Sequence, residues 1–391
     1  MHPLMFASLP APPLSLYIHL PWCVRKCPYC DFNSHAADSV PESDYVDALI
    51  ADLEADLPLV WGRRLESIFL GGGTPSLFSP EAIDRLLSAI RARLTCRPGI
   101  EISMEANPGT VEQDRFRGYR EAGVNRLSIG VQSFDDGLLQ RLERIHTGDE
   151  AHGAVAAARA AGFDNLNLDL MFGLPNQTLD QALKDLDTAL ALGPEHLSWY
   201  ELTLEPNTRF ASHPPMLPDE DTQWDMQQAG DERLRVAGYA HYEVSAHALP
   251  GRQCIHNLNY WHFGDYLGIG AGAHGKLTLP GEGRILRRWK QRQPQAFMDE
   301  ARAGSAVAGE RALTVADAAF EFMLNGLRLR NGVAVEMFTA HTGLTPEVLE
   351  PARGRAVERG LLANHADRLV ATELGRRYLN DLVGMFLEDQ P

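Results

Sequence analysis

Hydrophobic and polar positions follow two different periods over roughly the first 250 residues of the chain. Short apolar runs of strand length occur at 14–19, 66–70, 101–105, 126–131, 165–171, 196–203 and 241–245. Longer amphipathic stretches lie between them, and some begin with a helix-start signal such as Ser79 followed by Pro80. Another helix is expected from Thr178 to about residue 192, before Gly193. Strands that alternate with helices in this way predict βαβ units and a parallel sheet.

The number of these units indicates the architecture. At least six follow one another, which favours a closed or partly closed (β/α) barrel over an open doubly wound sheet. We therefore expect an α/β protein with a partial (β/α) barrel at 8–250. Residues 251–310 are rich in glycine and aromatic side chains and are expected to connect two domains. At 311–391, helices and two short strands (361–364 and 368–371) predict a helical, winged-helix-like domain.

Composition and charge narrow the location and the partners. A hydrophobic share of 45% with 23% charged residues is that of a soluble globular protein. No apolar run reaches the roughly 18 residues of a membrane span, and the N-terminal segment lacks the pattern of a secretory signal. We expect a cytoplasmic protein without an integral membrane segment. The formal net charge of −16 argues against nucleic acid as a partner, so we expect the C-terminal domain to act in packing or as a lid.

A local basic strip stands out from this acidic background. It consists of Arg284, Arg287, Arg288, Lys290 and Arg292. Such a strip is more often the solvated face of a short segment. The functional alternative is a docking site for carboxylates, such as the propionates of a porphyrin.

Three of the five cysteines, Cys23, Cys27 and Cys30, form a C-x3-C-x2-C loop directly after the first predicted strand. Three thiolates on a tight loop can hold three irons of a [4Fe–4S] cluster and leave the fourth iron open to a methionine moiety. Zinc is the alternative metal, with His19 or His35 as a fourth ligand. Structural zinc sites, however, usually group their ligands in separated pairs.

Further candidate residues follow the ends of other predicted strands. The sequence Gly-Gly-Gly-Thr-Pro at 71–75 follows the second strand, where glycine allows a ligand to approach the backbone. Glu105 ends the third strand, Gln132 ends the fourth, and Asp169 lies in the fifth. Functional residues of (β/α) barrels gather at the C-terminal ends of the strands, so these groups are expected at one rim together with the cysteine loop.

With these motifs the chain resembles the radical SAM family that contains oxygen-independent coproporphyrinogen III oxidase. The resemblance runs from about residue 14 to the C-terminus. It is carried by the segment Tyr-Ile-His-Leu-Pro-Trp-Cys at 17–23, the GGGTP turn, Glu-Ala-Asn-Pro at 105–108, Gly-Val-Gln-Ser-Phe at 130–134, and His256-Asn257 with Tyr260-Trp261. The combination of the cysteine loop with GGGTP is highly specific.

The resemblance implies a role for each matching residue. The three cysteines of the loop would ligate a [4Fe–4S] cluster. S-adenosylmethionine (SAM) would be surrounded by Tyr17, Gly72, Gly73, Thr74, Glu105, Gln132, Arg144 and Asp169. Glu105 suits the ammonium or a ribose hydroxyl of SAM, and Arg144 suits its carboxylate. Asp169 and Gln132 offer hydrogen bonds to the ribose or the adenine.

Two functions are compatible with this resemblance. The oxidases carry a further cysteine two residues after the third, where this chain has Phe32, and they have a longer N-terminal segment. Both departures favour the heme-chaperone branch, which implies binding of heme and its delivery to client hemoproteins, respiratory ones among the candidates. The alternative is the oxidase itself, a radical SAM oxidative decarboxylase.

His256 is the candidate heme ligand. An exposed histidine in an aromatic setting can bind the iron, with Tyr260 and Trp261 packed on the porphyrin. The alternative is a core histidine that is hydrogen-bonded to backbone. His274 is the next candidate.

Overall fold

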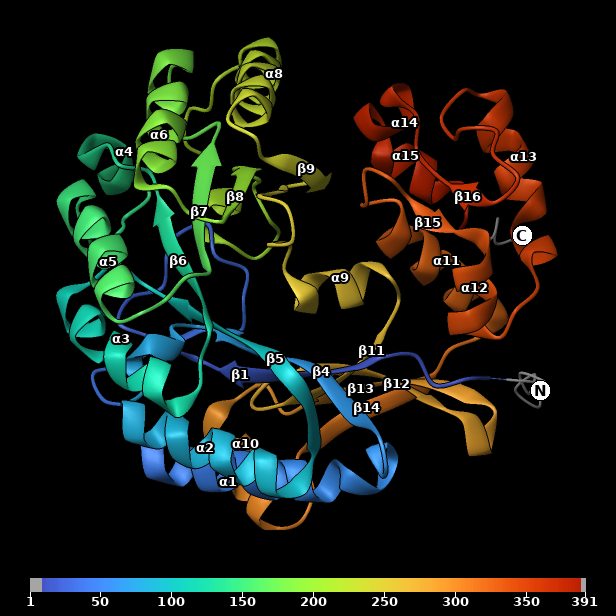
Figure 1. Cartoon of the computed structure of the whole chain (residues 1–391), viewed down its shortest axis with the longest axis horizontal. Coiled ribbons are helices and arrows are strands. Elements are labelled where there is room, and N and C mark those ends of the chain that lie inside the picture. Colours follow the sequence, from blue (N-terminus) through green and yellow to red (C-terminus); the bar gives the residue numbers. More distant parts are fainter. Residues whose placement is uncertain (1–8, 388–391) are drawn as a thin grey trace.

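One twelve-stranded sheet forms the frame of the computed structural model, which describes residues 9–387 (Figure 1). The strand order is β14-β13-β12-β11-β1-β4-β5-β6-β7-β8-β10-β9. Its central parallel strands are β1 (Leu14–Leu20), β4 (Arg64–Gly72), β5 (Thr95–Ala106), β6 (Arg126–Gln132), β7 (Leu166–Phe172) and β8 (His196–Glu201). Residue 8 and residues 388–391, the outer ends of two predicted domains, lie outside the described residues.

The predicted βαβ units are confirmed in the parallel part of the sheet. Its helices are α1 (Glu42–Asp56), α2 (Pro80–Arg93), α3 (Thr110–Ala122), α5 (Gly148–Ala160), α6 (Leu179–Leu192) and α8 (Glu220–Val236). The Ser79 side chain caps α2 by accepting a hydrogen bond from the backbone of Ala82, and Gly193 ends α6 in a left-handed conformation. These helices cover the outer face of the sheet, while α9 (Ile255–Trp261) lies on the inner, concave side (Figure 1).

The sheet is curved but open. Strands β9 and β14 stand at its two edges. The architecture is therefore the expected partial barrel. Its inner face is accessible at the C-terminal ends of the strands. The C-terminal region lies beside this opening (Figure 1) and lines it with residues 327–330 and 376–381.

The strand predicted at 241–245 is instead a hairpin. Strand β9 (Ala240–Glu243) turns into β10 (Ala246–Ala248), and β10 pairs antiparallel with β8. Only residues 244 and 245 separate the two strands, and so short a connection can join only antiparallel neighbours. The parallel series therefore ends at β8.

Residues 251–310, which we expected to connect two domains, contribute strands to the same sheet. Strand β11 (Asp265–Ile269) pairs parallel with β1, and β12 (His274–Leu279), β13 (Arg284–Lys290) and β14 (Val307–Ala312) extend the sheet antiparallel. Helix α10 (Pro294–Arg302) packs beside α1.

The basic strip on β13 differs from both expectations, because its central members are paired within the protein. Arg287 lies 2.6 Å from Glu321, and Arg288 lies 2.9 Å from Asp56. Lys290 is only 2% exposed and contacts Asp52 at 2.5 Å and Asp56 at 2.6 Å. The apolar pattern of a strand buries these three cations against Asp52 and Asp56 of α1 and against Glu321 of the C-terminal region, so they form neither a solvated face nor a docking site.

The C-terminal region is helical, as predicted, with α11 (Val315–Gly326), α12 (Val335–Thr342), α13 (Glu350–Glu358), α14 (Glu373–Arg377) and α15 (Leu379–Gly384). The strand pair expected at 361–371 is reduced to a single bridge between Leu362 and Ala371. Strand β16 (Arg368–Leu369) pairs instead with β15 (Val333–Ala334).

The C-terminal region shares a hydrophobic core with the edge of the sheet. Phe322 and Phe338 of its helices belong to the same buried cluster as Tyr242 and Phe263. The backbone N–H of Arg330 donates to the Tyr242 carbonyl at 3.0 Å. These contacts hold the region over the concave face. Of the helices in residues 9–387, none combines the length and the apolar character that a membrane crossing needs.

Candidate functional site

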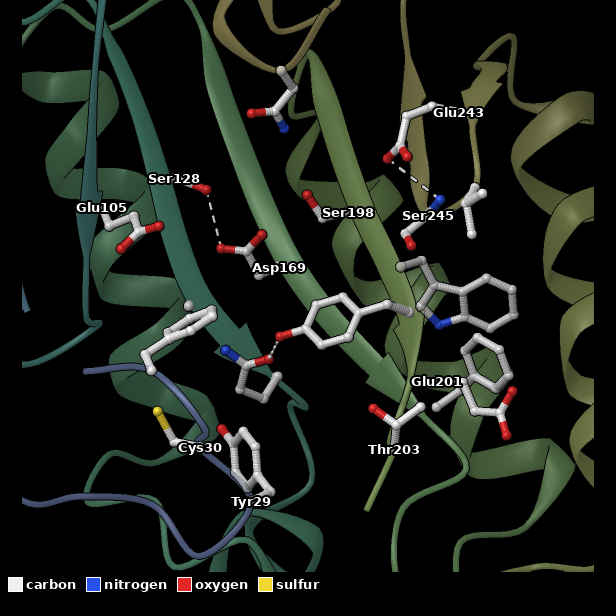
Figure 2. A pocket seen from close by; sticks show the side chains of 18 of the residues that line it. Tyr29, Cys30, Glu105, Ser128, Asp169, Ser198, Glu201, Thr203, Glu243 and Ser245 are labelled. Carbon is white, nitrogen blue, oxygen red and sulfur yellow. Dashed lines mark hydrogen bonds between the residues drawn. The ribbon is translucent and has the colours of Figure 1, made fainter. Parts of the chain in front are cut away.

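A cavity of about 1020 Å³ opens where the parallel strands end and the C-terminal region covers them. The cysteine loop, the GGGTP turn and the ends of β5 to β8 form one wall, and residues 327–330 and 376–381 form the opposite wall. Figure 2 shows Glu105, Ser128, Asp169 and Ser198 on neighbouring strands, with Tyr29 and Cys30 of the cysteine loop close by. The strand ends therefore meet at one rim, as the sequence predicts.

The three cysteines of the loop line this cavity as free, half-buried thiols. The Thr74 hydroxyl donates to Cys23 Sγ at 3.5 Å, and the Arg144 guanidinium donates to Cys27 Sγ at 3.6 Å. Burial raises the pKa of the Cys23 and Cys30 thiols. A metal centre that takes up their thiolates would compensate for this burial.

The arrangement of the sulfur atoms fits a cluster better than a single zinc ion. Thiolates on one tetrahedral zinc lie about 3.8 Å apart. The three sulfur atoms do not all lie within 4.8 Å of one another. A [4Fe–4S] cluster places each thiolate on its own iron and so suits wider spacing.

The histidines considered as a fourth zinc ligand do not complete such a site. His19 Nε2 lies 2.8 Å from the Asn33 carbonyl, and its Nδ1 lies 3.0 Å from the Tyr17 hydroxyl. His35 is not among the residues that line the cavity.

The GGGTP turn packs directly on the cysteine loop. The N–H groups of Gly73 and Thr74 donate to the carbonyls of Leu20 and Trp22 at 2.9 and 2.7 Å. A Cβ on Gly73 would lie 2.5 Å from the Trp22 carbonyl oxygen. A Cβ on Gly72, whose φ is +117°, would lie 2.5 Å from the His19 ring. We expected these two glycines to leave room for a ligand. This physical reason is wrong, because protein atoms occupy the space that a Cβ would take.

The acidic candidates are buried around the same rim. Glu105 accepts a hydrogen bond from the Gly72 N–H at 3.1 Å, and burial, with Asp169 nearby, raises its pKa to about 7. Asp169 accepts hydrogen bonds from Ser128 at 3.0 Å and from Asn167 at 2.8 Å, and burial raises its pKa as well. Among the described residues, Glu105 forms no ion pair with a lysine, arginine or histidine. The two buried carboxylates therefore form a suitable pocket for a cationic ligand.

Gln132 and Arg144 complete the set of predicted groups that line the cavity. Gln132 adopts a positive φ of 66° and accepts a hydrogen bond from the Tyr200 hydroxyl at 2.8 Å. Arg144 donates to the Gly130 carbonyl at 2.7 Å and to Asn107 at 2.9 Å.

Arg144 also has an unused donor. Burial works against its charge, yet Tyr29 and Cys27 together raise its pKa above the ordinary value. Its buried Nε has no hydrogen-bond partner among the described residues. A guanidinium with a spare N–H in this position fits the carboxylate of a ligand.

Tyr17 and His256 lie in a second, smaller cavity of about 240 Å³, which also includes Glu105 and Asp169. Tyr17 is therefore not brought into the main cavity with the other predicted SAM residues. His256 is 1% exposed, with Nδ1 3.0 Å from the Ser67 hydroxyl and Nε2 3.0 Å from the Tyr260 hydroxyl. Burial lowers its pKa to about 3. The expected exposed heme ligand is thus a buried histidine with both ring nitrogens in use, because α9 packs against β4.

His274 is exposed but lies elsewhere. It stands on β12, where its ring stacks beside Trp289, and it does not line either cavity.

Sequence reasoning missed several residues that line the main cavity. Asn107, two positions after Glu105, links Arg144 to the Thr74 hydroxyl at 3.1 Å. Its place in the segment at 105–108 was the available signal. The opposite wall contains Trp261, which the sequence had already marked. It also contributes residues with no such signal, namely Arg328, Arg330, Arg376, Arg377 and Tyr378.

Comparisons with known proteins agree with this geometry. Residues 17–189 match the family model of the radical SAM superfamily, and residues 313–378 match the HemN C-terminal domain. The fold and the cysteine site therefore define a radical SAM protein. The chain is 53% identical to heme chaperone HemW of Escherichia coli K12, covering 97% of this chain and 99% of the relative. It is 34% identical to heme chaperone HemW of Bacillus subtilis 168, covering 95% and 99%. The chain belongs to the HemW family.

A solved structure supports the fold. Coproporphyrinogen III oxidase (HemN) from Escherichia coli, a radical SAM enzyme, superposes with a TM-score of 0.80 over 98% of this chain and 92% of that chain. The two sequences are 24% identical. The likeness covers the curved sheet and the helical C-terminal region together.

Proposed function

We propose that this protein is a cytoplasmic heme chaperone, which binds heme and hands it to client hemoproteins, respiratory ones included. It carries a [4Fe–4S] cluster on Cys23, Cys27 and Cys30 and binds SAM beside it. The observation that carries the proposal is the single cavity of about 1020 Å³, which has two chemically different walls. The name of the HemW relatives supports the same assignment.

The size of the cavity leaves room for a second ligand. Small-molecule pockets commonly span about 300–1,000 Å³, and this one lies at the upper end of that range. SAM occupies the wall formed by the strand ends. The remaining space faces Trp261 and the arginines of the C-terminal region.

That second wall suits a flat, apolar ring with carboxylate side chains. The Arg328 guanidinium lies over the Trp261 ring at 4.2 Å. Burial, together with the neighbouring Arg376, lowers the pKa of Arg330. A bound carboxylate relieves the repulsion between these two cations. Heme, with an aromatic macrocycle and two propionates, has this combination of features.

The wall formed by the strand ends, here called the SAM wall, carries groups that match the charges of SAM. When bound, the cluster supplies an electron and an open iron for the methionine moiety. Arg144, with its spare Nε–H, holds the SAM carboxylate. Glu105 pairs with a cationic group or a ribose hydroxyl, and Asp169 and Gln132 offer further hydrogen bonds to the nucleoside.

Coproporphyrinogen oxidation is the second candidate function, because the same cluster and SAM site would serve it. Phe32 argues for the chaperone. It lines the cavity, is 59% exposed and stands where the resembling oxidases carry an additional cysteine. An exposed aromatic ring at this place supplies apolar contact and no thiol.

A charge reversal on the second wall tests the proposal. The Arg330→Glu variant should weaken heme binding by on the order of tenfold or more, because it removes a charge-assisted hydrogen bond and adds repulsion. The measurement is a heme titration of the anaerobically purified protein, followed by absorbance. Lys184→Glu makes the same change of charge at an exposed position of helix α6 and is the matched control. Equal heme affinity in the wild type and both variants would contradict heme binding in this cavity.

A further inference from the structure

Three metal-ligand side chains meet outside the cysteine site, at the edge of the sheet. His241 on β9 and His247 on β10 are directly paired across the hairpin, and their rings stack with centroids 4.0 Å apart. Asp231 reaches both from α8, with Oδ2 3.4 Å from His241 Nδ1 and Oδ1 3.2 Å from His247 Nε2. One ligand atom from each of the three residues lies within 4.8 Å of the others.

The tautomer of His241 leaves a lone pair facing the carboxylate. Nε2 of His241 lies 3.2 Å from the Val244 carbonyl oxygen. A carbonyl can only accept, so Nε2 carries the proton and Nδ1 carries the lone pair. That Nδ1 makes no hydrogen bond with any described residue, although the Asp231 oxygen lies 3.4 Å away. Two acceptors at this distance repel each other unless a cation lies between them.

His247 supplies a second, deeply buried nitrogen donor. Its side chain is 2% exposed, and its Nε2 lies 3.2 Å from Asp231 Oδ1. Asp231 lies close to both rings, and its side chain is 22% exposed. The cluster therefore brings one carboxylate and two imidazole nitrogens together at a spacing that suits a metal ion.

We propose that Asp231, His241 and His247 bind one divalent ion of the Zn²⁺ class. Ligand atoms on a tetrahedral zinc lie about 3.3 Å apart, and the two carboxylate-to-imidazole distances here are 3.4 and 3.2 Å. The Val244 carbonyl fixes the His241 ring in the way that outer hydrogen bonds usually orient a metal-binding histidine. Binding displaces the proton shared between His247 and Asp231.

The ion can enter from solvent and would stabilise one edge of the molecule. The side chains of His241 and Asp231 are 14% and 22% exposed, which leaves a fourth position for water. The metal ties the hairpin to α8. The same hairpin carries Glu243, which pairs with Arg328 at 3.3 Å and bridges to Leu329 of the C-terminal region. The site therefore supports the wall on which the main cavity depends, and it is separate from the cysteine loop.

Cobalt titration of the anaerobically purified, cluster-loaded protein tests this site. We expect one equivalent of Co²⁺ to bind with the visible bands of nitrogen and oxygen ligation and without thiolate charge-transfer absorption. Asp231→Asn should lower the affinity by on the order of tenfold or more, and the double variant His241→Gln/His247→Gln should abolish binding. His213→Gln is the matched control, because His213 is an exposed histidine directly after the short helix α7 (Arg209–Ser212).

A thermal melt provides a second readout that does not depend on the cobalt spectrum. Added Zn²⁺ should raise the melting temperature of the wild type and of His213→Gln, because a ligand of the folded state stabilises it, and should leave the double variant unchanged. Unaltered Co²⁺ binding in the double variant, thiolate charge-transfer bands in the wild type, or no binding at all would each overturn the proposal. The last result would leave a proton as the only cation between Asp231 and His241.

Discussion

Arg144 is the residue on which the polar contacts of the SAM wall converge. Its guanidinium contacts Cys27 Sγ, the Asn107 side chain and the Gly130 carbonyl. It therefore joins the cysteine loop to the ends of β5 and β6. Since only a planar, multiply donating cation can hold three acceptors and still present a free N–H, lysine would not replace it.

Removing one thiol from the loop should remove the cluster. In Cys27→Ala the iron loses one of three protein ligands, so we expect about four irons per chain in the wild type and almost none in the variant. Iron and sulfide analysis of anaerobically purified protein measures this. Cys96→Ala, a half-buried cysteine outside the cavity, is the control and should keep its iron. Full iron content in Cys27→Ala would show that the metal is held elsewhere.

SAM affinity should depend on pH through Glu105. Its pKa is raised to about 7 in the unliganded protein, and a cationic ligand would lower it, so binding releases a proton below pH 7. Affinity should therefore rise, by up to about tenfold per pH unit, until about pH 7 and then level off. The Glu105→Gln variant should bind SAM more weakly, and its SAM affinity should lack the rise with pH that Glu105 causes. Equilibrium binding of SAM between pH 5.5 and 8 provides the comparison, and identical profiles for the two proteins would contradict the role of Glu105.

Some site residues could be predicted from the sequence, because a motif or the end of a strand marks their position. The spacing of the cysteines and the strand ends at Glu105 and Asp169 required no knowledge of side-chain packing. The burial of His256 could not be predicted, because it depends on α9 folding back so that the ring contacts Ser67 of β4, far away in the sequence. The same holds for Tyr17, whose hydroxyl turns toward His19.

At the scale of elements, the turn after β4 and the cysteine loop behave as one unit. Two backbone hydrogen bonds join them, and Gly73 allows the close approach to Trp22. The sequence predicted both elements and their common rim. It did not predict that they touch, since an apolar strand pattern fixes the direction of a loop but not its contacts.

Gly73→Ala should therefore disturb the cluster as well as SAM binding. The new Cβ would lie 2.5 Å from the Trp22 carbonyl, which is backbone and can move only with the loop. We expect less iron per chain than in the wild type and a lower melting temperature. Gly354→Ala, in α13 with open space around it, is the control. It should keep its iron and raise the melting temperature slightly, because alanine favours the helix. Iron content and SAM affinity equal to those of the wild type would show that the loop accommodates the side chain.

At the scale of the whole molecule, the cavity exists because the C-terminal region lies over the sheet. The strand pattern predicted a partial barrel, and the open edges at β9 and β14 agree with it. The joint cavity was not predictable, because its second wall comes from residues 327–330 and 376–381. Long-range contacts hold these residues against the barrel, namely the core around Phe322 and Tyr242 and the pairing of residues 328 and 329 with Glu243. The C-terminal region therefore contributes to the site through its position over the sheet, and no sequence motif marks its residues.

One measurement tests the central claim most directly. The anaerobically purified, cluster-loaded protein is given SAM, a reductant and either coproporphyrinogen III or heme, with an oxygen-independent coproporphyrinogen III oxidase as the positive control. We expect stoichiometric, stable heme binding and no protoporphyrinogen IX, while the control enzyme forms it steadily. Sustained conversion of coproporphyrinogen III by this protein, or failure to retain heme, would contradict the account.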